Sequence, residues 1–367
     1  MRIRLSSYHS SYRLASLATT EESLMKMNSY GFRSVYIDGN NLLFHPEKVV
    51  VQVSQEDADK LREICDFSIL EFMDEAVYIA YDASKDDNVI FITNRCNSNC
   101  IMCPVSEQVR RRAEIMELPY LLTICRQIPD DIHHLTITGG EPFLLHEGMF
   151  KLLQTIKQRL DDTEILLLTN GRAFADKNYV DKLCETMPSK LLIGIPVHGS
   201  NETRHDFITQ APGSFRETYL GLKHLLAQKM SVEVRIVVSK LNYQDMTNIA
   251  DLLINNFNRV KVVRFMGLEM LGNAHKNSDQ VWIDYNEAFK AIETAVKKLL
   301  IAGIDVSLYN FPLCSVKKGY WTICEKSISE HKVRFLDECE ECNVKALCGG
   351  IFAGSINQVK GSIKAIR

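Results

Sequence analysis

The sequence lacks the features that would bring the protein into a membrane or onto a nucleic acid. None of its 367 residues lies in an apolar run of about 18, the length that a membrane-spanning helix needs. Lys and Arg number 43 against 46 Asp and Glu, which gives a formal net charge of −3. Because neither sign dominates, we expect no binding to nucleic acid or to an anionic membrane surface.

The first residues also lack the pattern of a secretory signal. Two early arginines, Arg2 and Arg4, are not followed by an apolar stretch. Eleven cysteines without such a signal indicate a reducing compartment, in which thiols bind metals rather than form disulfides. We therefore expect a cytoplasmic protein. Its hydrophobic content of 46% is that of an ordinary globular chain, and its length allows two or three domains.

Three of the cysteines are crowded into one short stretch. Cys96, Cys100 and Cys103 have the spacing CxxxCxxC and follow the apolar run 89–93. Thiolates are soft ligands that suit iron–sulfur clusters or zinc, and three of them can hold a four-iron cluster while one iron stays open to a small molecule. A zinc knuckle is the alternative, as are three buried thiols. Zinc sites, however, usually combine CxxC pairs, or CxxC with HxxxH, and the stretch shows neither pattern.

From residue 89 onward, apolar strand patterns alternate with helical ones. The expected strands are 89–93, 134–138, 164–169, 190–197, 232–239 and 259–266. The expected helices are 118–128, 149–160, 177–187, 214–229 and 243–257, with Asp176 and Ser214 at N-cap positions. Nearly continuous apolar strands are typical of a parallel sheet with both faces buried. Six such units in series predict either an open doubly wound sheet or a barrel.

This arrangement would gather several motifs at one rim. Parallel α/β sheets and barrels place their active sites at the carboxyl ends of the strands. The cysteine stretch follows the first expected strand, and Gly139-Gly140-Glu141-Pro142 follows the second. The segments 169–171 and 197–199 end the third and fourth strands. We therefore expect all four segments to face one site.

Residues 1–85 precede this pattern and read as a small α+β extension. Strands are expected at 35–38, 49–54 and 76–80, and a helix at 55–66 with Ser54 as its cap and an apolar face of Ala58, Leu61 and Ile64. The extension could brace the main domain, or it could hold a partner peptide at an exposed sheet edge. Cys65 has no cysteine neighbours, and we expect it to be buried.

The last section of the chain is again rich in cysteine. A long helix at 284–302 closes the alternating region, and residues 304–367 contain Cys314, Cys324, Cys339, Cys342 and Cys348. Four thiolates could form a structural zinc site or hold a cluster. Two further cysteines, Cys125 and Cys184, fall within apolar helical stretches, and we expect both to be core thiols.

The two glycine- and cysteine-bearing motifs together resemble those of a known superfamily. The segment 93–103, Thr-Asn-Arg-Cys-Asn-Ser-Asn-Cys-Ile-Met-Cys, resembles the signature of radical S-adenosyl-L-methionine (SAM) enzymes, and the segment 138–142, Thr-Gly-Gly-Glu-Pro, resembles their second motif. The resemblance implies a partial (β/α)6 barrel in which Cys96, Cys100 and Cys103 hold a 4Fe-4S cluster. It also implies that SAM binds the fourth iron and is cleaved reductively to methionine and a 5′-deoxyadenosyl radical, which abstracts hydrogen from a substrate.

The same resemblance suggests which residues touch SAM. It assigns SAM contacts to Met102, Gly139, Gly140, Glu141 and Asn170. Where many members have an aromatic residue, this chain has Met102, which is flexible and polarizable enough to pack on a purine. At the strand-four position where many members have a ribose-binding Ser, the chain has Pro196, and His198 lies two residues further on at the same rim. A lone His is either a substrate contact or a satisfied structural residue.

The C-terminal cysteines resemble the SPASM or twitch domains of radical SAM peptide maturases. Such domains carry auxiliary clusters, and the resemblance implies one auxiliary 4Fe-4S cluster with Cys314, Cys339, Cys342 and Cys348 as ligands. Cys324 is the reserve ligand. The expected domains are then 1–85, an N-terminal extension; 86–303, the radical SAM core; and 304–367, the auxiliary-cluster domain.

Short patterns narrow the resemblance further. The segments 327–332, 335–339 and 348–352, taken with the first cysteine motif, are similar to the radical SAM maturase of the His-Xaa-Ser system. The resemblance implies a ribosomally made His-Xaa-Ser repeat peptide as substrate and a second radical SAM protein as partner. It also implies an electron donor such as flavodoxin or ferredoxin.

Three functions are therefore compared below. The first is a radical SAM oxidoreductase that modifies a peptide or protein side chain. The second is a radical SAM enzyme that acts on a nucleotide or another small molecule. The third, of a different class, is a non-catalytic iron–sulfur or zinc protein that binds a partner. Metal content and SAM cleavage after reduction distinguish the third from the first two.

Overall fold

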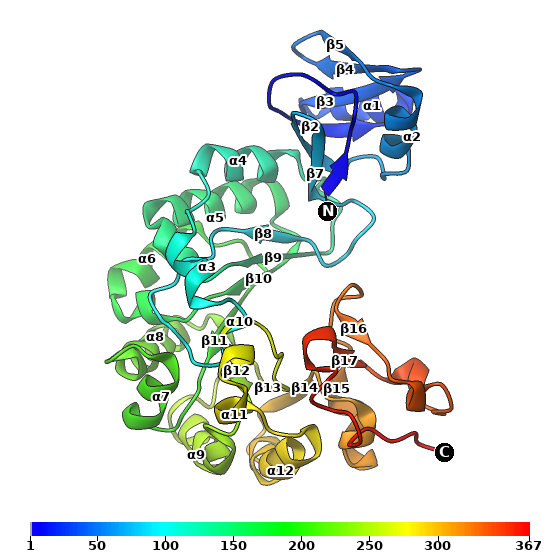
Figure 1. Cartoon of the computed structure of the whole chain (residues 1–367). Helices are drawn as coiled ribbons and strands as arrows, with labels where there is room; N and C mark the ends of the chain where they lie inside the picture. Colours follow the sequence, from blue (N-terminus) through cyan, green and yellow to red (C-terminus); the bar gives the residue numbers. More distant parts are fainter. Residues whose placement is uncertain (1) are drawn as a thin grey trace.

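A computed structural model describes residues 2–367 and places three parts along the chain: an N-terminal sheet, a helix-covered parallel sheet and a C-terminal section of short turns (Figure 1). The N-terminal sheet has the strand order β1-β7-β6-β2-β3-β4-β5, and only the β2–β3 pair is parallel. Its strands are β1 Arg2–Arg4, β2 Arg13–Ala18, β3 Ser34–Asp38, β4 Asn41–His45, β5 Val49–Gln52, β6 Ile69–Met73 and β7 Ala76–Tyr81. Two helices, α1 Glu21–Ser29 and α2 Gln55–Arg62, accompany it.

The α+β character predicted for this region is confirmed. Ser54 caps α2 by accepting a hydrogen bond from the backbone N–H of Asp57 at 3.2 Å, and Ala58, Leu61 and Ile64 are buried as expected. The helix ends at Arg62, four residues earlier than predicted. The expectation for Cys65 was wrong, because this residue follows the end of the helix and is exposed.

The middle of the chain forms an eight-stranded parallel sheet in consecutive order. Its strands are β8 Val89–Phe91, β9 His134–Thr138, β10 Glu164–Leu168, β11 Leu191–Pro196, β12 Ser231–Val237, β13 Val262–Met266, β14 Asp305–Tyr309 and β15 Cys324–Glu325. The two end strands, β8 and β15, do not pair with each other, so the sheet is an open, partial barrel. The predicted α/β class with six strand–helix units is confirmed, and β14 and β15 extend the sheet beyond them.

Helices cover the outer face of this sheet (Figure 1). They include α4 Leu118–Gln127, α5 Glu147–Leu160, α6 Lys177–Thr186, α8 Ser214–Ala227, α9 Met246–Asn256 and α12 Tyr285–Ile301; the shorter ones are α3 Glu107–Arg112, α7 Glu202–Thr209, α10 Gly272–Lys276 and α11 Ser278–Val281. Outward-facing strand residues such as Ile137, Leu167 and Val234 are fully buried in the core. The inner face is less apolar than predicted, because it carries charged residues from β12 and β13.

Two details of the helices differ from expectation. Asp176 caps α6 as predicted, but α8 is preceded by Gly213 as its N-cap and Ser214 is its first residue. Cys125 on α4 is buried as predicted, whereas Cys184 on α6 is exposed, which corrects its assignment as a core thiol. The apolar stripe of α6 runs through Val180 and Leu183, so Cys184 points away from the core.

The C-terminal section consists of short turns and a two-stranded antiparallel sheet, β16 Val333–Arg334 and β17 Ile351–Phe352. Two of its strands, β14 and β15, pair with the central sheet although they lie beyond residue 303. The predicted domain boundaries stay predictions. Among residues 2–367 the structure has no helix that combines the length and the apolar character of a bilayer span.

Candidate metal and cofactor site

The cysteine stretch and the first glycine pair meet in one cavity. Cys96, Cys100 and Cys103 all line a hollow of about 290 Å³ at the carboxyl ends of the parallel strands. From the strands and the loops that follow them, the other lining residues include Thr138, Gly139, Gly140, Asn170, Gly194, Pro196, His198, Arg235, Val237 and Met266. The rim predicted from strand order is therefore a cavity that all three cysteines line.

Hydrogen bonds to two distant segments hold the cysteine loop. The side-chain amide of Asn273 donates to the carbonyl of Cys100 at 3.1 Å, and its backbone N–H donates to the carbonyl of Cys103 at 2.9 Å. Asn277 donates to the carbonyl of Ile101 at 3.0 Å. On the other side, the N–H of Asn99 donates to the carbonyl of Thr209 at 2.9 Å. The loop is thus fixed by backbone contacts that do not depend on a bound metal.

The glycine pair is required by the close approach of the cysteine loop itself. A Cβ atom on Gly139 would lie 2.5 Å from the carbonyl oxygen of Thr93, and one on Gly140 would lie 2.1 Å from the carbonyl oxygen of Arg95. The N–H of Gly140 donates to Thr93 at 2.6 Å, and the N–H of Glu141 donates to Arg95 at 2.9 Å. Since no side chain fits between these backbones, the two motifs form one unit.

Glu141 lies behind the cavity wall rather than in the cavity. The residue is 2% exposed, and its carboxylate accepts hydrogen bonds from the N–H of Asn170 at 2.7 Å, the hydroxyl of Thr169 at 2.8 Å and the N–H of Phe143 at 3.0 Å. Burial raises the pKa of Glu141 above its ordinary value, against the lowering effect of these hydrogen bonds. Glu141 therefore orients Asn170, whose side chain reaches the loop.

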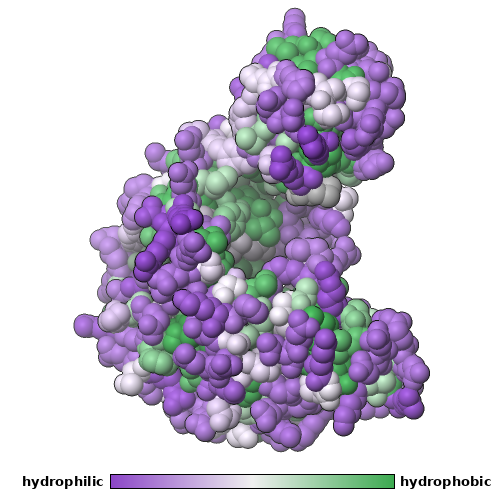
Figure 2. All heavy atoms as spheres, viewed as in Figure 1, coloured by the Kyte–Doolittle hydropathy of each residue, from purple (hydrophilic) through white to green (hydrophobic). Residues whose placement is uncertain are grey.

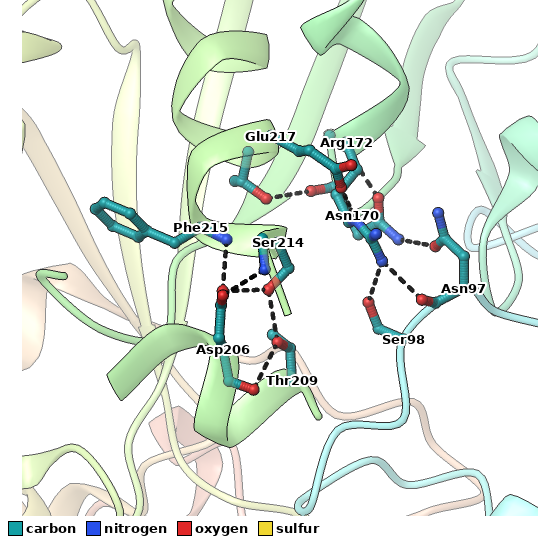
Figure 3. Close-up of polar contacts among 12 residues, drawn as sticks. Asn97, Ser98, Asn170, Arg172, Asp206, Thr209, Ser214, Phe215 and Glu217 are labelled. Atoms are coloured by element: carbon teal, nitrogen blue, oxygen red, sulfur yellow. Dashed lines mark hydrogen bonds and ion pairs between the residues drawn. The ribbon is translucent and has the colours of Figure 1, made fainter. Parts of the chain in front are cut away.

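Arg172 and Asn170 form hydrogen bonds with the first turn of the cysteine loop (Figure 3). The side-chain amide of Asn170 donates to Asn97 at 2.6 Å and lies 3.9 Å from the sulfur of Cys96. Arg172 donates through one terminal nitrogen to the carbonyl of Asn97 at 2.6 Å and to the hydroxyl of Ser98 at 3.1 Å, while its Nε pairs with Glu217 of α8. This arginine ties the loop after β10 and helix α8 to the cysteine loop.

A carboxylate on α7 accepts hydrogen bonds from the first residues of α8, the helix that pairs with Arg172 (Figure 3). Asp206 accepts hydrogen bonds from the hydroxyl of Ser214 at 2.8 Å and from the backbone N–H groups of Phe215 at 2.7 Å and Gly213 at 2.5 Å. Burial acts to raise the pKa of Asp206, but these hydrogen bonds outweigh it and lower the pKa. Because Gly213 has no side chain, Asp206 supplies the capping acceptors that α8 otherwise lacks.

The chemistry of the three thiols fits a bound metal cluster. Burial, followed by the neighbouring thiols, raises the pKa of Cys100 to about 12, and burial also raises the pKa of Cys96. Thiols with raised pKa values are protonated at neutral pH, so binding as thiolates requires a metal that displaces the protons. The described residues contain no group of three or more His, Cys, Asp or Glu side chains placed for one metal ion. A cluster spreads its ligands over several irons, one thiolate on each.

The C-terminal cysteines also share one neighbourhood. Burial raises the pKa of Cys314, Cys339 and Cys324, the last to about 12, and the thiol of Cys348 adds to the rise in all three. The sulfur of Cys348 accepts hydrogen bonds from the N–H groups of Leu313 and Gly350, each at 3.4 Å. Cys342 adjoins this group through Cys339. The choice of ligands, with Cys324 in reserve, stays a prediction.

Not every residue expected to touch SAM lines the cavity. Gly139, Gly140 and Asn170 line it, whereas Glu141 lies behind the wall. Met102 is 4% exposed and belongs to a small apolar cluster with Ile208, Leu268, Met270, Ala274 and Val281. The predicted SAM contacts of these residues stay predictions.

Sequence reasoning missed several residues of this cavity, among them Arg172, His205 and Arg235. Arg235 could have been recognised because it and Glu233 are two charges within a strand whose other residues are mostly apolar. His205 belongs to a buried pair with His198, whose backbone N–H donates to the Nδ1 of His205 at 3.3 Å. Burial lowers the pKa of His198 to about 3 and that of His205 to about 4, so both rings are neutral at pH 7. The Nδ1 of His198 has no hydrogen-bond partner among residues 2–367.

Comparison with known proteins agrees with this geometry. Residues 90–253, which span the cysteine loop, the glycine pair and strands β9 to β12, match the model of the Radical SAM superfamily. This stretch of the chain is therefore similar to a radical SAM domain. The iron–sulfur cluster and SAM that this family binds would lie at the three cysteines and the glycine pair.

Curated relatives of the radical SAM domain are distant in sequence. The chain is 26% identical over 217 residues to GTP 3′,8-cyclase of Petrotoga mobilis, covering 58% of this chain and 64% of that protein. It is 24% identical over 159 residues to the antilisterial bacteriocin subtilosin biosynthesis protein AlbA of Bacillus subtilis, covering 43% of this chain and 34% of that protein. The matched region therefore spans less than two thirds of each relative.

Solved structures with similarity to the chain include anSMEcpe with bound AdoMet, at a TM-score of 0.46 and 17% identity, covering 60% of this chain and 61% of that one. The crystal structure of SuiB from Streptococcus suis has a TM-score of 0.48 and 12% identity, and the match covers 69% of this chain and 54% of that one.

Proposed function

We propose that this protein is a radical SAM enzyme that modifies a ribosomally made peptide or protein. The observation that carries the proposal is the single cavity in which Cys96, Cys100 and Cys103 meet the Gly139-Gly140 pair. When bound, the 4Fe-4S cluster and SAM would supply one-electron reduction and a 5′-deoxyadenosyl radical for hydrogen abstraction. The chain's own residues hold the cysteine loop and shape the cavity beneath it.

The substrate class rests on two supports. Relatives of the radical SAM domain include the subtilosin biosynthesis protein and the sporulation killing factor maturation protein SkfB, both of Bacillus subtilis. In addition, the five C-terminal cysteines lie together, as an auxiliary 4Fe-4S cluster on Cys314, Cys339, Cys342 and Cys348 would require. The partners proposed with this function are a peptide of the His-Xaa-Ser type, a second radical SAM protein and a flavodoxin or ferredoxin as donor.

A nucleotide substrate is the second candidate. It is favoured by the similarity to GTP 3′,8-cyclases over 217 residues. The charge of the chain does not support it, because acidic residues slightly outnumber basic ones. Incubation of the reduced enzyme with deuterated peptides or deuterated GTP would decide between the two, since the abstracted deuterium is recovered in 5′-deoxyadenosine.

The decisive test of the proposed function is the formation of 5′-deoxyadenosine from SAM by the dithionite-reduced protein. Anaerobically reconstituted protein should contain about eight irons per chain and should cleave SAM. Cys100→Ala should remove cleavage, because one iron then lacks its thiolate, while Cys65→Ala, at an exposed thiol outside both clusters, should retain it. Iron-loaded protein that forms no 5′-deoxyadenosine, or protein that binds only zinc, would instead support a non-catalytic metal-binding role.

A further inference from the structure

We call the cavity lined by Cys96, Cys100 and Cys103 the SAM cavity, or upper cavity. The open barrel contains a second, lower cavity of about 470 Å³. Its walls come from the inner face of the sheet, and its lining includes five basic and three acidic residues. The basic residues are Lys190, Lys261, Lys326, Arg235 and Arg264, and the acidic residues are Glu164, Glu233 and Glu325. No cysteine contributes to this wall. Among residues 2–367, Arg235 is the only residue that lines both cavities.

Strand register places a polar row across the inner face at this level. Pro196 of β11, Arg235 of β12, Arg264 of β13 and Ser307 of β14 are direct partners in neighbouring parallel strands. Arg264 donates through one of its two terminal nitrogens to Ser307 at 3.3 Å and to Glu325 at 3.0 Å. Arg235, by contrast, is the member of this row that lines both cavities.

A buried carboxylate orients Arg235 from behind. Glu233 is fully buried and accepts from the Nε of Arg235 at 2.5 Å and from the Nε of Arg264 at 2.6 Å. Gly194 on β11 leaves room for this pair, since a Cβ there would lie 3.0 Å from Glu233 and 3.3 Å from the Nε of Arg235. The guanidinium also lies over the ring of Tyr309, 5.9 Å from its centroid. These contacts hold the guanidinium in one orientation.

The outward end of Arg235 has no partner. Within the part of the chain that the structure describes, neither terminal nitrogen of Arg235 makes a hydrogen bond, and the side chain is 18% exposed. Two terminal N–H groups held side by side match the two oxygens of a carboxylate. Two of the three lysines of the lower cavity are engaged elsewhere, because Lys190 donates to the carbonyl of Asp162 at 2.7 Å and Lys326 to that of Ala346. The third, Lys261, is exposed.

We propose that Arg235 binds a carboxylate group of the peptide substrate and so sets which residue lies beneath SAM. The inference rests on the proposed function and names the substrate chemistry: an acidic side chain or a free C-terminal carboxylate. A nucleoside triphosphate fits less well, because its three to four negative charges would lie beside the carboxylates of Glu233 and Glu325.

The open side of the sheet gives such a peptide access. Figure 2 shows the molecule hollowed between its N-terminal and C-terminal parts, with apolar surface inside the hollow. At the unpaired edge, Val89 and Phe91 of β8 are 43% and 41% exposed. Their partners in β9 are Thr136 and Thr138, and Thr138 lines the SAM cavity. An extended chain that lies along β8 would therefore run beside the SAM cavity.

The test is equilibrium dialysis of the full-length, cluster-reconstituted, SAM-loaded protein against a peptide mixture. N-acetylated, C-amidated peptides of one Gly-Ser host sequence carry Asp, Asn, Glu or Gln at one central position, and a further Asn peptide has a free C-terminal carboxylate. We expect the Asp or Glu peptide, or the free-carboxylate peptide, to bind at least roughly tenfold more tightly than its amide counterpart, as a charge-assisted bidentate contact would. Which of these peptides gains affinity identifies the source of the carboxylate.

Three variants make the result specific to Arg235. Arg235→Gln should remove the preference for acid over amide, and Arg235→Lys, which keeps the charge and the partner Glu233, should retain part of it. If the Gln variant fails to fold, as judged by thermal melting, the Lys variant alone decides. Arg216→Gln, at an exposed position of α8 outside both cavities, should keep the full preference.

Several outcomes would overturn the inference. Equal binding of acid and amide peptides by the wild-type protein, including no measurable binding of either, would do so. So would a preference that persists in both Arg235 variants, or an Arg235-dependent affinity for GTP in place of the peptides. A loss of SAM affinity in Arg235→Lys without a change in peptide preference would assign the arginine to the carboxylate of SAM. Wild-type protein that forms no 5′-deoxyadenosine refutes the proposed function itself, whatever the peptides do.

Discussion

At the scale of single residues, Gly140 is the position at which one methyl group should separate the two motifs. Its Cβ would lie 2.1 Å from the carbonyl oxygen of Arg95, and the obstacle is backbone rather than a flexible side chain. We expect Gly140→Ala to lower the free energy of unfolding by about 1–3 kcal/mol or more. It should also reduce the iron bound at the cysteine loop, measured by iron content after anaerobic reconstitution.

The matched control for this change is Gly319→Ala. A Cβ at Gly319 has no atom within 4 Å, and its backbone φ lies outside the left-handed region. This variant should melt and bind iron like the wild type. Equal iron content and equal melting in both alanine variants would show that the close approach of the two backbones is unimportant.

The pair His198 and His205 should give the folded protein a pH-dependent stability. Burial lowers the pKa of these side chains to about 3 and about 4, below the ordinary value of about 6.5. The unfolded chain therefore binds more protons as pH falls below about 6.5, and the folded state loses up to about 1.4 kcal/mol per pH unit for each ring. Their full stabilisation is present above pH 6.5.

Urea unfolding at about pH 7 and about pH 5 measures this effect. The drop in unfolding free energy between the two pH values should be smaller in His198→Gln and in His205→Gln, because Gln does not titrate. His275→Gln is the control, since that residue is exposed and lies outside the cavity. A drop that is identical in all four proteins would show that the buried pair titrates normally.

At the scale of secondary-structure elements, Arg172 connects the end of β10, helix α8 and the cysteine loop (Figure 3). It pairs with Glu217 and donates to Asn97 and Ser98. Hydrogen bonds from a charged donor contribute about 1.5–3 kcal/mol. We expect Arg172→Ala to lower the stability by about that amount and to speed the loss of iron to a chelator, followed by the decay of cluster absorbance.

Arg216→Ala provides the comparison, because it removes an exposed arginine one residue before Glu217 on the same helix. It should release iron at the wild-type rate. If Arg172→Ala also released iron at that rate, the cysteine loop would be held sufficiently by Asn273 and Asn277 alone.

The elements that sequence patterns predicted are those whose residues are apolar over several positions. Strands β9 to β13 and helix α12 were found because their apolar stretches are long enough to show the hydrophobic periodicity of a strand or a helix. Strand β15 has two residues and β14 alternates with polar ones, so neither stood out from a loop. Cys184 was misplaced because apolar neighbours in sequence do not share its face of the helix.

The location of the candidate site was also predictable from the sequence. Strand order alone brings the cysteines, the glycine pair and Asn170 to one rim, since parallel strands end at the same edge. The side-chain directions were not predictable. Glu141 turns into the wall because three donors surround it there, and Arg235 points inward because of its position in the pleat.

At the scale of the whole molecule, the C-terminal cysteines should hold together a section that has little other structure. Residues from 326 onward contain two strands of two residues each and several short turns. Cys342 accepts a hydrogen bond from the N–H of Ile366 at 3.5 Å, so the group of thiols reaches the last residues described. A metal site can supply much of the folding energy of such a small section.

Cys348→Ala tests this role, because Cys348 is the thiol that influences Cys314, Cys324 and Cys339 together. The variant should lose about four of about eight irons per chain and keep the spectrum of the SAM-binding cluster. Limited proteolysis should then cut the section after residue 326 faster than in the wild type, since the cluster no longer links its turns. Cys65→Ala should leave both measurements unchanged. Full iron content in Cys348→Ala would assign the second cluster to other ligands, and unchanged proteolysis would show that packing against the barrel suffices to order the section.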